Sequence, residues 1–211
     1  VTSPDKSTPG AVSTGQDGSS LGDINTPTVT YAAFVPDFHF DMREGLFVGG
    51  MFFNGRAIDL VEQAKQPFLN PVEMQSTKKE VVSKVKENYQ VLMESVYGKD
   101  VFDDTDVAFE AIADSIAAFE RTSVFSPFDS KFDMVLKGEA IYTPEEQLGH
   151  DLFIAEDKAN CAACHPVPTR KSRKSERLFT DFTYDNLGVP KNILVRQKNG
   201  KNSAYIDNGL Y

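Results

Sequence analysis

The sequence has no tryptophan and only two cysteines, Cys161 and Cys164, which stand three positions apart. Two neighbouring cysteines provide no disulfide framework between distant parts of the chain. No run approaches the ~18 apolar residues of a membrane span. No signal peptide is visible at Val1, so an exported protein would have lost it or carried it outside this sequence. Basic residues are also few: 22 Lys and Arg stand against 31 Asp and Glu, for a net charge of −9. Phosphate groups would be repelled, which argues against nucleic acid as a partner.

Apolar residues make up 40% of the chain and include 16 Phe, enough for a core. Their spacing predicts a mainly α fold with long loops. Capping residues and prolines set the expected limits of each helix, with Thr77 and Glu80 forming a capping box and Thr143 an N-cap paired with Glu146. The expected helices lie at 57–64, ended by Pro67 and Pro71, at 77–98, at 105–122 and at 143–155.

Long stretches between these helices carry weak signals. Residues 1–24 are rich in Ser, Thr, Gly, Pro and Asp, so we expect an extended segment lying on a larger body. Residues 29–35 are an ambiguous short strand. A change of composition near Gly138 suggests two lobes, 1–137 and 138–211.

The segment Cys161-Ala-Ala-Cys164-His165 carries the clearest chemistry. Two thiols at this spacing can bond the two vinyl groups of one haem, and the adjacent imidazole can ligate its iron, which is the pattern of c-type haem attachment. A thioredoxin-like motif is an alternative, although no βαβ pattern surrounds it. A zinc site is another, but it needs a fourth ligand, and His39 and His150 are distant in sequence. Two buried structural cysteines are the third.

Aromatic residues flank the motif and are candidate walls for an apolar macrocycle: Phe153, Phe179 and Phe182. Ordinary core aromatics remain the alternative for each. The ligand opposite His165 stays open, because none of the five Met lies after the motif. That ligand decides between electron transfer and chemistry at the iron.

A series of short motifs resembles the bacterial dihaem cytochrome c peroxidases and their relatives. In chain order the motifs are Asn25-Thr26-Pro27-Thr28, Asn54-Gly55-Arg56-Ala57, Glu62-Gln63-Ala64, Asn70-Pro71-Val72-Glu73-Met74, Phe119-Glu120-Arg121-Thr122, Ser126-Pro127-Phe128-Asp129, Cys161–His165, Phe179-Thr180-Asp181-Phe182 and Asn186-Leu187-Gly188-Val189-Pro190.

The resemblance implies a periplasmic protein with two cytochrome c-like lobes, each holding one haem c. The first haem would reduce hydrogen peroxide, and the second, on Cys161, Cys164 and His165, would accept electrons from a small cytochrome c or cupredoxin. A homodimer is compatible with the family. This chain has no first CxxCH and stops before the family's later ligands, so we interpret it as the middle of a longer protein, with an incomplete first lobe. A natural single-haem protein is the alternative.

Four further residues take roles from the resemblance alone. Glu73 would be the acid–base group for peroxide, and Gln63 would line the same pocket. Asn25 would help to hold calcium between the lobes. Phe53 stands where the family commonly has a Trp between the haems, and it keeps the packing but loses the indole N–H. The distal His that some members have is replaced by the stretch at 16–18.

The function that these features favour is reduction of hydrogen peroxide to water. A dihaem oxidase acting on a protein or organic substrate, and a plain electron carrier, are the alternatives. The loop 169–177 carries five basic residues and one Glu, and it is interpreted either as solvated or as a docking patch for an acidic electron donor.

The first prediction concerns covalent attachment. The intact mass of the chain should exceed the polypeptide mass by one haem, because two thioether bonds hold the group. The haem should also survive acid–acetone extraction. An apo mass or bound zinc would contradict the assignment.

Overall fold

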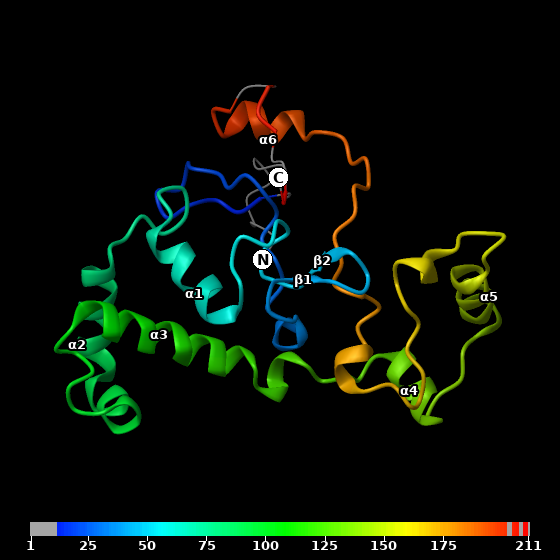
Figure 1. Ribbon diagram of the computed structural model, residues 1–211, viewed down its shortest axis with the longest axis horizontal. Coiled ribbons are helices and arrows are strands. Elements are labelled where there is room, and N and C mark those ends of the chain that lie inside the picture. Colours follow the sequence, from blue (N-terminus) through cyan, green and yellow to red (C-terminus); the bar gives the residue numbers. More distant parts are fainter. Residues whose placement is uncertain (1–11, 202–203, 207–208, 211) are drawn as a thin grey trace.

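The structure, a computed structural model, describes residues 12–201, 204–206 and 209–210. Within these residues it is mainly helical, as predicted, with one small antiparallel sheet (Figure 1). The α-helices are α1 (Leu60–Leu69), α2 (Lys78–Tyr97), α3 (Thr105–Glu120), α4 (Lys131–Lys137), α5 (Pro144–Ile154) and α6 (Ile193–Lys198). The strands are β1 (His39–Asp41) and β2 (Leu46–Val48), and short 3-10 turns are η1 (Ala32–Phe34), η2 (Ser123–Phe125), η3 (Cys161–Ala163) and η4 (Lys174–Glu176).

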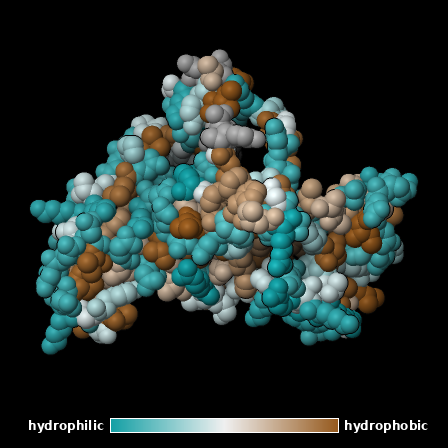
Figure 2. Space-filling view, in the orientation of Figure 1, coloured by the Kyte–Doolittle hydropathy of each residue, from teal (hydrophilic) through white to brown (hydrophobic). Residues whose placement is uncertain are grey.

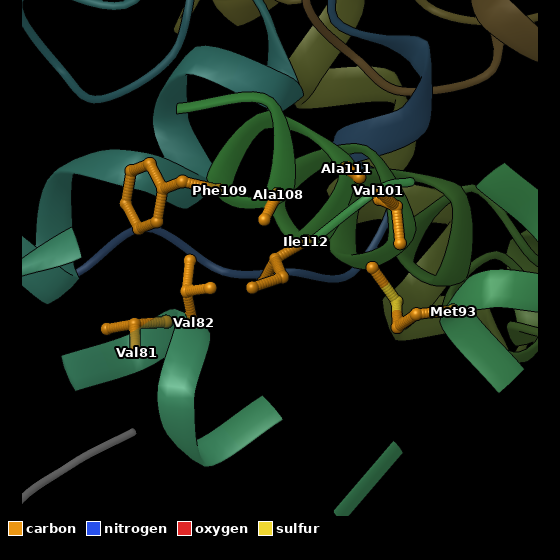
Figure 3. Packing of buried hydrophobic residues seen from close by; sticks show 8 residues of the cluster. All are labelled: Val81, Val82, Met93, Val101, Ala108, Phe109, Ala111 and Ile112. Atoms are coloured by element: carbon orange, nitrogen blue, oxygen red, sulfur yellow. The ribbon is translucent and has the colours of Figure 1, made fainter. Parts of the chain in front are cut away.

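Helices α2 and α3 form the largest apolar cluster. The predicted capping box starts α2, since the Thr77 side chain accepts from the backbone N–H of Glu80 and Glu80 bonds back. Asp104 caps α3 in a similar way. The buried residues that pack between them are Val81, Val82, Met93, Val101, Ala108, Phe109, Ala111 and Ile112 (Figure 3). Further along the predicted stripes, Leu92, Val96 and Phe119 are exposed, although the Phe119 ring still packs on that of Phe125 at 5.1 Å.

Helix α1 differs from its predicted limits. It begins at Leu60, capped by Asp59, and it runs through Pro67 to Leu69. The prediction that Pro67 ends the helix is wrong. Proline lacks the N–H that would bond the carbonyl of Gln63, but this loss falls in the last turn, where it is tolerated. The helix ends at Asn70, whose extended ψ of 123° suits the residue before Pro71.

The ambiguous strand at 29–35 is the 3-10 turn η1. Strands occur instead in the β1–β2 hairpin, which the sequence patterns did not indicate. Its connection contains Gly45 at φ 70°, a conformation that suits glycine. The aromatic rings of Phe38 and Phe47 stack at 5.3 Å, so packing between rings stabilises this small sheet.

The second half of the chain returns to the first. After α4, which was not predicted, and α5, the chain passes the hairpin and ends near the N-terminal segment (Figure 1). Val195 of α6 packs with Val12 and Leu21, and Asp23 accepts from Asn199 and Lys201. The segment 12–24 therefore lies on a larger body, as predicted, while residues 1–11 fall outside the described part. No described helix is long and apolar enough to cross a bilayer.

Candidate functional site

The cysteine motif forms a 3-10 turn. The backbone N–H of Cys164 donates to the carbonyl of Cys161 at 3.2 Å, and that of His165 donates to the same carbonyl at 2.9 Å. Residues three apart eclipse one another in a 3-10 turn, so both thiols project to the same side. Both cysteines are free. The turn thus brings two free cysteines close together along the chain, at the spacing that two thioether bonds to one haem require.

The imidazole of His165 is oriented by a backbone carbonyl. Its Nδ1 lies 2.9 Å from the carbonyl oxygen of Phe179. A carbonyl only accepts, so Nδ1 carries the proton and Nε2 keeps its lone pair for a metal. Phe179 adopts φ 52°, a left-handed conformation that is rare for a bulky side chain. The carbonyl is therefore placed at some conformational cost.

Apolar side chains surround this turn. The Phe153 ring lies 6.4 Å from the His165 ring and 6.1 Å from that of Phe179, which also packs on Phe132 at 4.6 Å. The predicted wall residue Phe182 instead joins the hairpin region, where its carbonyl accepts from Gly49.

Helix α5 buries none of its residues, and Figure 2 shows brown side chains exposed on that side of the molecule. The large exposed apolar residues on α5 and just before it are Ile141, Leu148, Leu152 and Ile154. So much exposed apolar surface suits a large apolar group, and these residues fit a haem.

The zinc alternative finds no support in this geometry. Among the described residues, no three His, Cys, Asp or Glu side chains gather where they could hold a metal ion.

A second feature is a pocket of about 660 Å³ in the first half of the chain. Its volume lies within the roughly 300–1,000 Å³ of cofactor sites. Gln63 of α1 and Glu73 of the following loop both line it and are half-buried, and Asn25 lines its exposed rim. The structure thus brings these three predicted residues to one pocket. Phe53 is not among the lining residues, and its side chain is 58% exposed.

The loop that carries Glu73 is held by backbone bonds. The N–H of Glu73 donates to the carbonyl of Asn70 at 3.0 Å, and the carbonyl of Glu73 accepts from the N–H of Gln16 at 2.7 Å. The N-terminal segment approaches so closely that a Cβ on Gly15 would lie 2.5 Å from the carbonyl oxygen of Val72. Glycine at this position therefore permits the contact.

The segment 16–18, where the resemblance implied the loss of a distal His, forms a tight turn. The carboxylate of Asp17 accepts from Ser20 and from the backbone N–H of Ser19. These hydrogen bonds hold the pKa of Asp17 well below its usual range. The Asp17 carboxylate therefore stays ionised near neutral pH and holds the turn.

Two pocket residues were missed by the sequence analysis. The Arg56 guanidinium lies 3.5 Å from the ring centroid of Phe52 and donates to Asn54 and Gln66. Its place in the Asn54-Gly55-Arg56-Ala57 motif was a usable signal. Tyr205 lines the pocket from the other end of the chain. No local pattern indicated it, because only the return of the chain brings it there.

Similarity to known proteins identifies the family of this chain. A family model described as di-haem cytochrome c peroxidase matches residues 3–141. The chain belongs to the di-haem cytochrome c peroxidase family.

The similar proteins include a methylamine utilization protein and two peroxidases. Methylamine utilization protein MauG of Paracoccus denitrificans is 46% identical over 204 residues, covering 95% of this chain and 51% of MauG. Cytochrome c peroxidase Ccp of Escherichia coli is 34% identical over 70% of this chain and 28% of its own length. The solved diheme peroxidase BthA of Burkholderia thailandensis matches 95% of this chain with a TM-score of 0.86 and 30% identity, and 48% of BthA is covered. The chain spans about half the length of MauG and BthA.

Gly15→Ala tests the close approach beside Glu73. The added methyl should lower the free energy of unfolding by about 1–3 kcal/mol, the usual cost of overpacking. Gly22→Ala is the matched control, because its Cβ would meet its nearest atom at 3.6 Å. That control should change stability by no more than about 0.5 kcal/mol. Urea unfolding of the haem-loaded protein, followed by circular dichroism, compares them, and equal effects would contradict the argument.

Proposed function

We propose that this chain is part of a dihaem enzyme that reduces hydrogen peroxide to water with electrons from a small redox protein. The observation that carries the proposal is the pocket where Gln63 and Glu73 lie together, in a chain that also presents a haem-attachment turn. Family membership supplies the reaction class. The reaction takes two electrons and two protons per peroxide and yields two waters.

The proposal assigns one covalent haem c to this chain. Cys161 and Cys164 would form the thioether bonds, and Nε2 of His165 would ligate the iron. The longer protein would hold a second haem against the pocket, so that residues 1–137 and 138–211 belong to two cytochrome c-like lobes. When bound, a haem supplies the iron at which peroxide is reduced or through which electrons enter. Phe53 would lie on the route between the two haems.

Within the pocket, Glu73 would move a proton from one oxygen of peroxide to the other, so that water can leave. General acid–base catalysis needs the carboxylate within hydrogen-bond reach of the peroxide. The backbone bonds to Asn70 and Gln16 hold the loop of Glu73 in place. The amide of Gln63 would orient the peroxide by hydrogen bonding. Together these residues provide positioning and proton transfer.

A second function is oxidation of a protein or organic substrate. The 46% identity to a methylamine utilization protein over 95% of this chain favours it. So does the Asp17 turn, which takes the place of a distal His. Stoichiometry separates the two: a peroxidase consumes two equivalents of one-electron donor per peroxide, whereas the oxidase would take the same two electrons from its substrate. A plain electron carrier would turn over no peroxide.

Other assignments follow from the family and belong to the same proposal. The donor would be a cytochrome c or cupredoxin, and the protein would work in the periplasm. Asn25 would provide an oxygen ligand to calcium between the lobes, since calcium favours amide and carbonyl oxygens. A turn-capping role is the alternative for Asn25.

Glu73→Gln tests the proton-transfer role in the full-length haem-loaded protein. Removing the acid–base group should lower peroxide turnover by ~10²-fold or more. The spectrum of the haem on Cys161 and Cys164 should not change, because that haem lies elsewhere. Glu87→Gln on α2 makes the same chemical change at an exposed position and should leave turnover intact.

Near-normal turnover of the Glu73→Gln protein would remove this residue from the mechanism. A loss of the haem spectrum would instead indicate misfolding, and Glu73→Asp would then test the position, since it keeps the carboxylate and moves it by one methylene. Partial activity of the Glu73→Asp protein would support proton transfer by the carboxylate. Loss of activity in both variants, with the haem spectra unchanged, would also support it.

Calcium removal tests Asn25. Chelation of the full-length protein should alter its haem spectrum and lower its activity, and added calcium should restore both. Asn25→Ala should raise the calcium concentration needed for recovery, whereas Asn88→Ala, an exposed amide on α2, should not. A full-length protein indifferent to chelation in spectrum and activity would contradict the site.

A further inference from the structure

The loop 169–177 is closed at the haem ligand. His165 precedes the loop by four residues, and Phe179 follows it by two. The hydrogen bond of 2.9 Å between His165 Nδ1 and the Phe179 carbonyl joins the two ends. The loop lies beside α4 (Figure 1), where the ammonium of Lys174 is 5.9 Å from the centroid of the Phe128 ring. Side chains on this loop are therefore held close to the candidate haem.

Internal bonds give the loop a defined shape. Ser172 donates its N–H to the Thr169 carbonyl at 3.0 Å, and the short turn η4 follows. The Nε of Arg177, which is half-buried, donates to the Ser172 carbonyl at 3.2 Å. The loop is thus a folded surface on which charges have fixed neighbours.

The charge of this loop is opposite to that of the rest of the chain. Five basic residues and one Glu give it a net charge of +4, and the chain as a whole carries −9, which leaves −13 for the other residues. Arg173 pairs with Glu176. Arg170, Lys171 and Lys174 are exposed and form no ion pair within the residues that the structure describes. Three cations thus remain available to a partner.

A polyanion such as nucleic acid does not fit, because its length would bring phosphates against the acidic remainder. A small acidic protein fits better. The remainder of the surface repels it, and the loop attracts it, so that encounter is directed to one place. That place is the haem-attachment turn.

We propose that loop 169–177 docks an acidic redox protein, which passes electrons to the haem on Cys161 and Cys164. This inference rests on the proposed function, and it adds the charge of the partner and the surface that selects it. Exposed charges of this kind act mainly on the rate of association, and they act less at high salt.

Charge reversal tests the loop in the full-length haem-loaded protein. The variant R170E/K171E/K174E reverses the three available cations. The control K79E/K84E/K99E makes the same change of net charge on exposed lysines on and just after α2, at the opposite end of the molecule (Figure 1). Stopped-flow absorbance follows reduction of the haem, without peroxide, by two probes: a reduced acidic cupredoxin and a reduced basic cytochrome c.

With the acidic cupredoxin, reduction of the unaltered protein should slow by about 10-fold or more from low to high salt. The loop variant should be about 10-fold slower at low salt and lose the salt dependence, while the control should change by less than about 3-fold. The basic cytochrome c should show no such loss. Circular dichroism and the haem spectrum check the fold of each variant.

Equal slowing by the loop variant and the control would overturn the proposal, because net charge alone would then explain the rate. Salt-independent reduction of the unaltered protein would overturn it without any variant, as would faster reduction by the basic probe at low salt. A different result would contradict the proposed function. A protein that is reduced normally but turns over no peroxide would contradict peroxide reduction and leave the docking surface standing.

Discussion

The hydrogen bond from His165 to the Phe179 carbonyl is the contact on which the second half of the chain depends. It fixes the imidazole tautomer and leaves the lone pair of Nε2 available to a metal. It also closes loop 169–177, so that the basic loop cannot move away from the haem-attachment turn. The same stretch then continues to Phe182, whose carbonyl accepts from Gly49, and to Tyr184, whose hydroxyl donates to the carbonyl of Gly49. One segment thus links His165 to the hairpin.

The packing around this segment requires a glycine at position 55. A Cβ on Gly55 would lie 2.8 Å from the Phe38 ring and 2.9 Å from the Tyr184 hydroxyl. Gly55 has φ 64°, so both its backbone conformation and its surroundings favour glycine. Burial raises the pKa of Tyr184, which keeps the phenol neutral and able to donate to Gly49. The two halves of the chain are therefore joined by contacts that tolerate little added volume.

The pocket depends on a comparable meeting of distant segments. Its walls come from the N-terminal segment, the Asn54–Arg56 turn, α1 and the loop after it, with Tyr205 from the far end. Asp23 accepts from Asn199 and Lys201, and the Lys201 ammonium lies 4.0 Å from the centroid of the Tyr205 ring. Electrostatic contacts therefore tie the last described segment to the first. The proposed acid–base group sits where these segments join.

The sequence by itself determined the features that depend on neighbouring residues. Capping of α2 by Thr77 and of α5 by Thr143 was predicted because each cap bonds residues within one turn. The Cys161–His165 motif was likewise recognised from residues that are neighbours in the sequence. Tertiary structure decided the rest: Pro67 stays inside α1, and residues 29–35 form no strand. Tyr205 reaches a pocket lined by Glu73, and Phe53 is left exposed. The last two outcomes depend on packing between segments far apart in the chain, which no local pattern records.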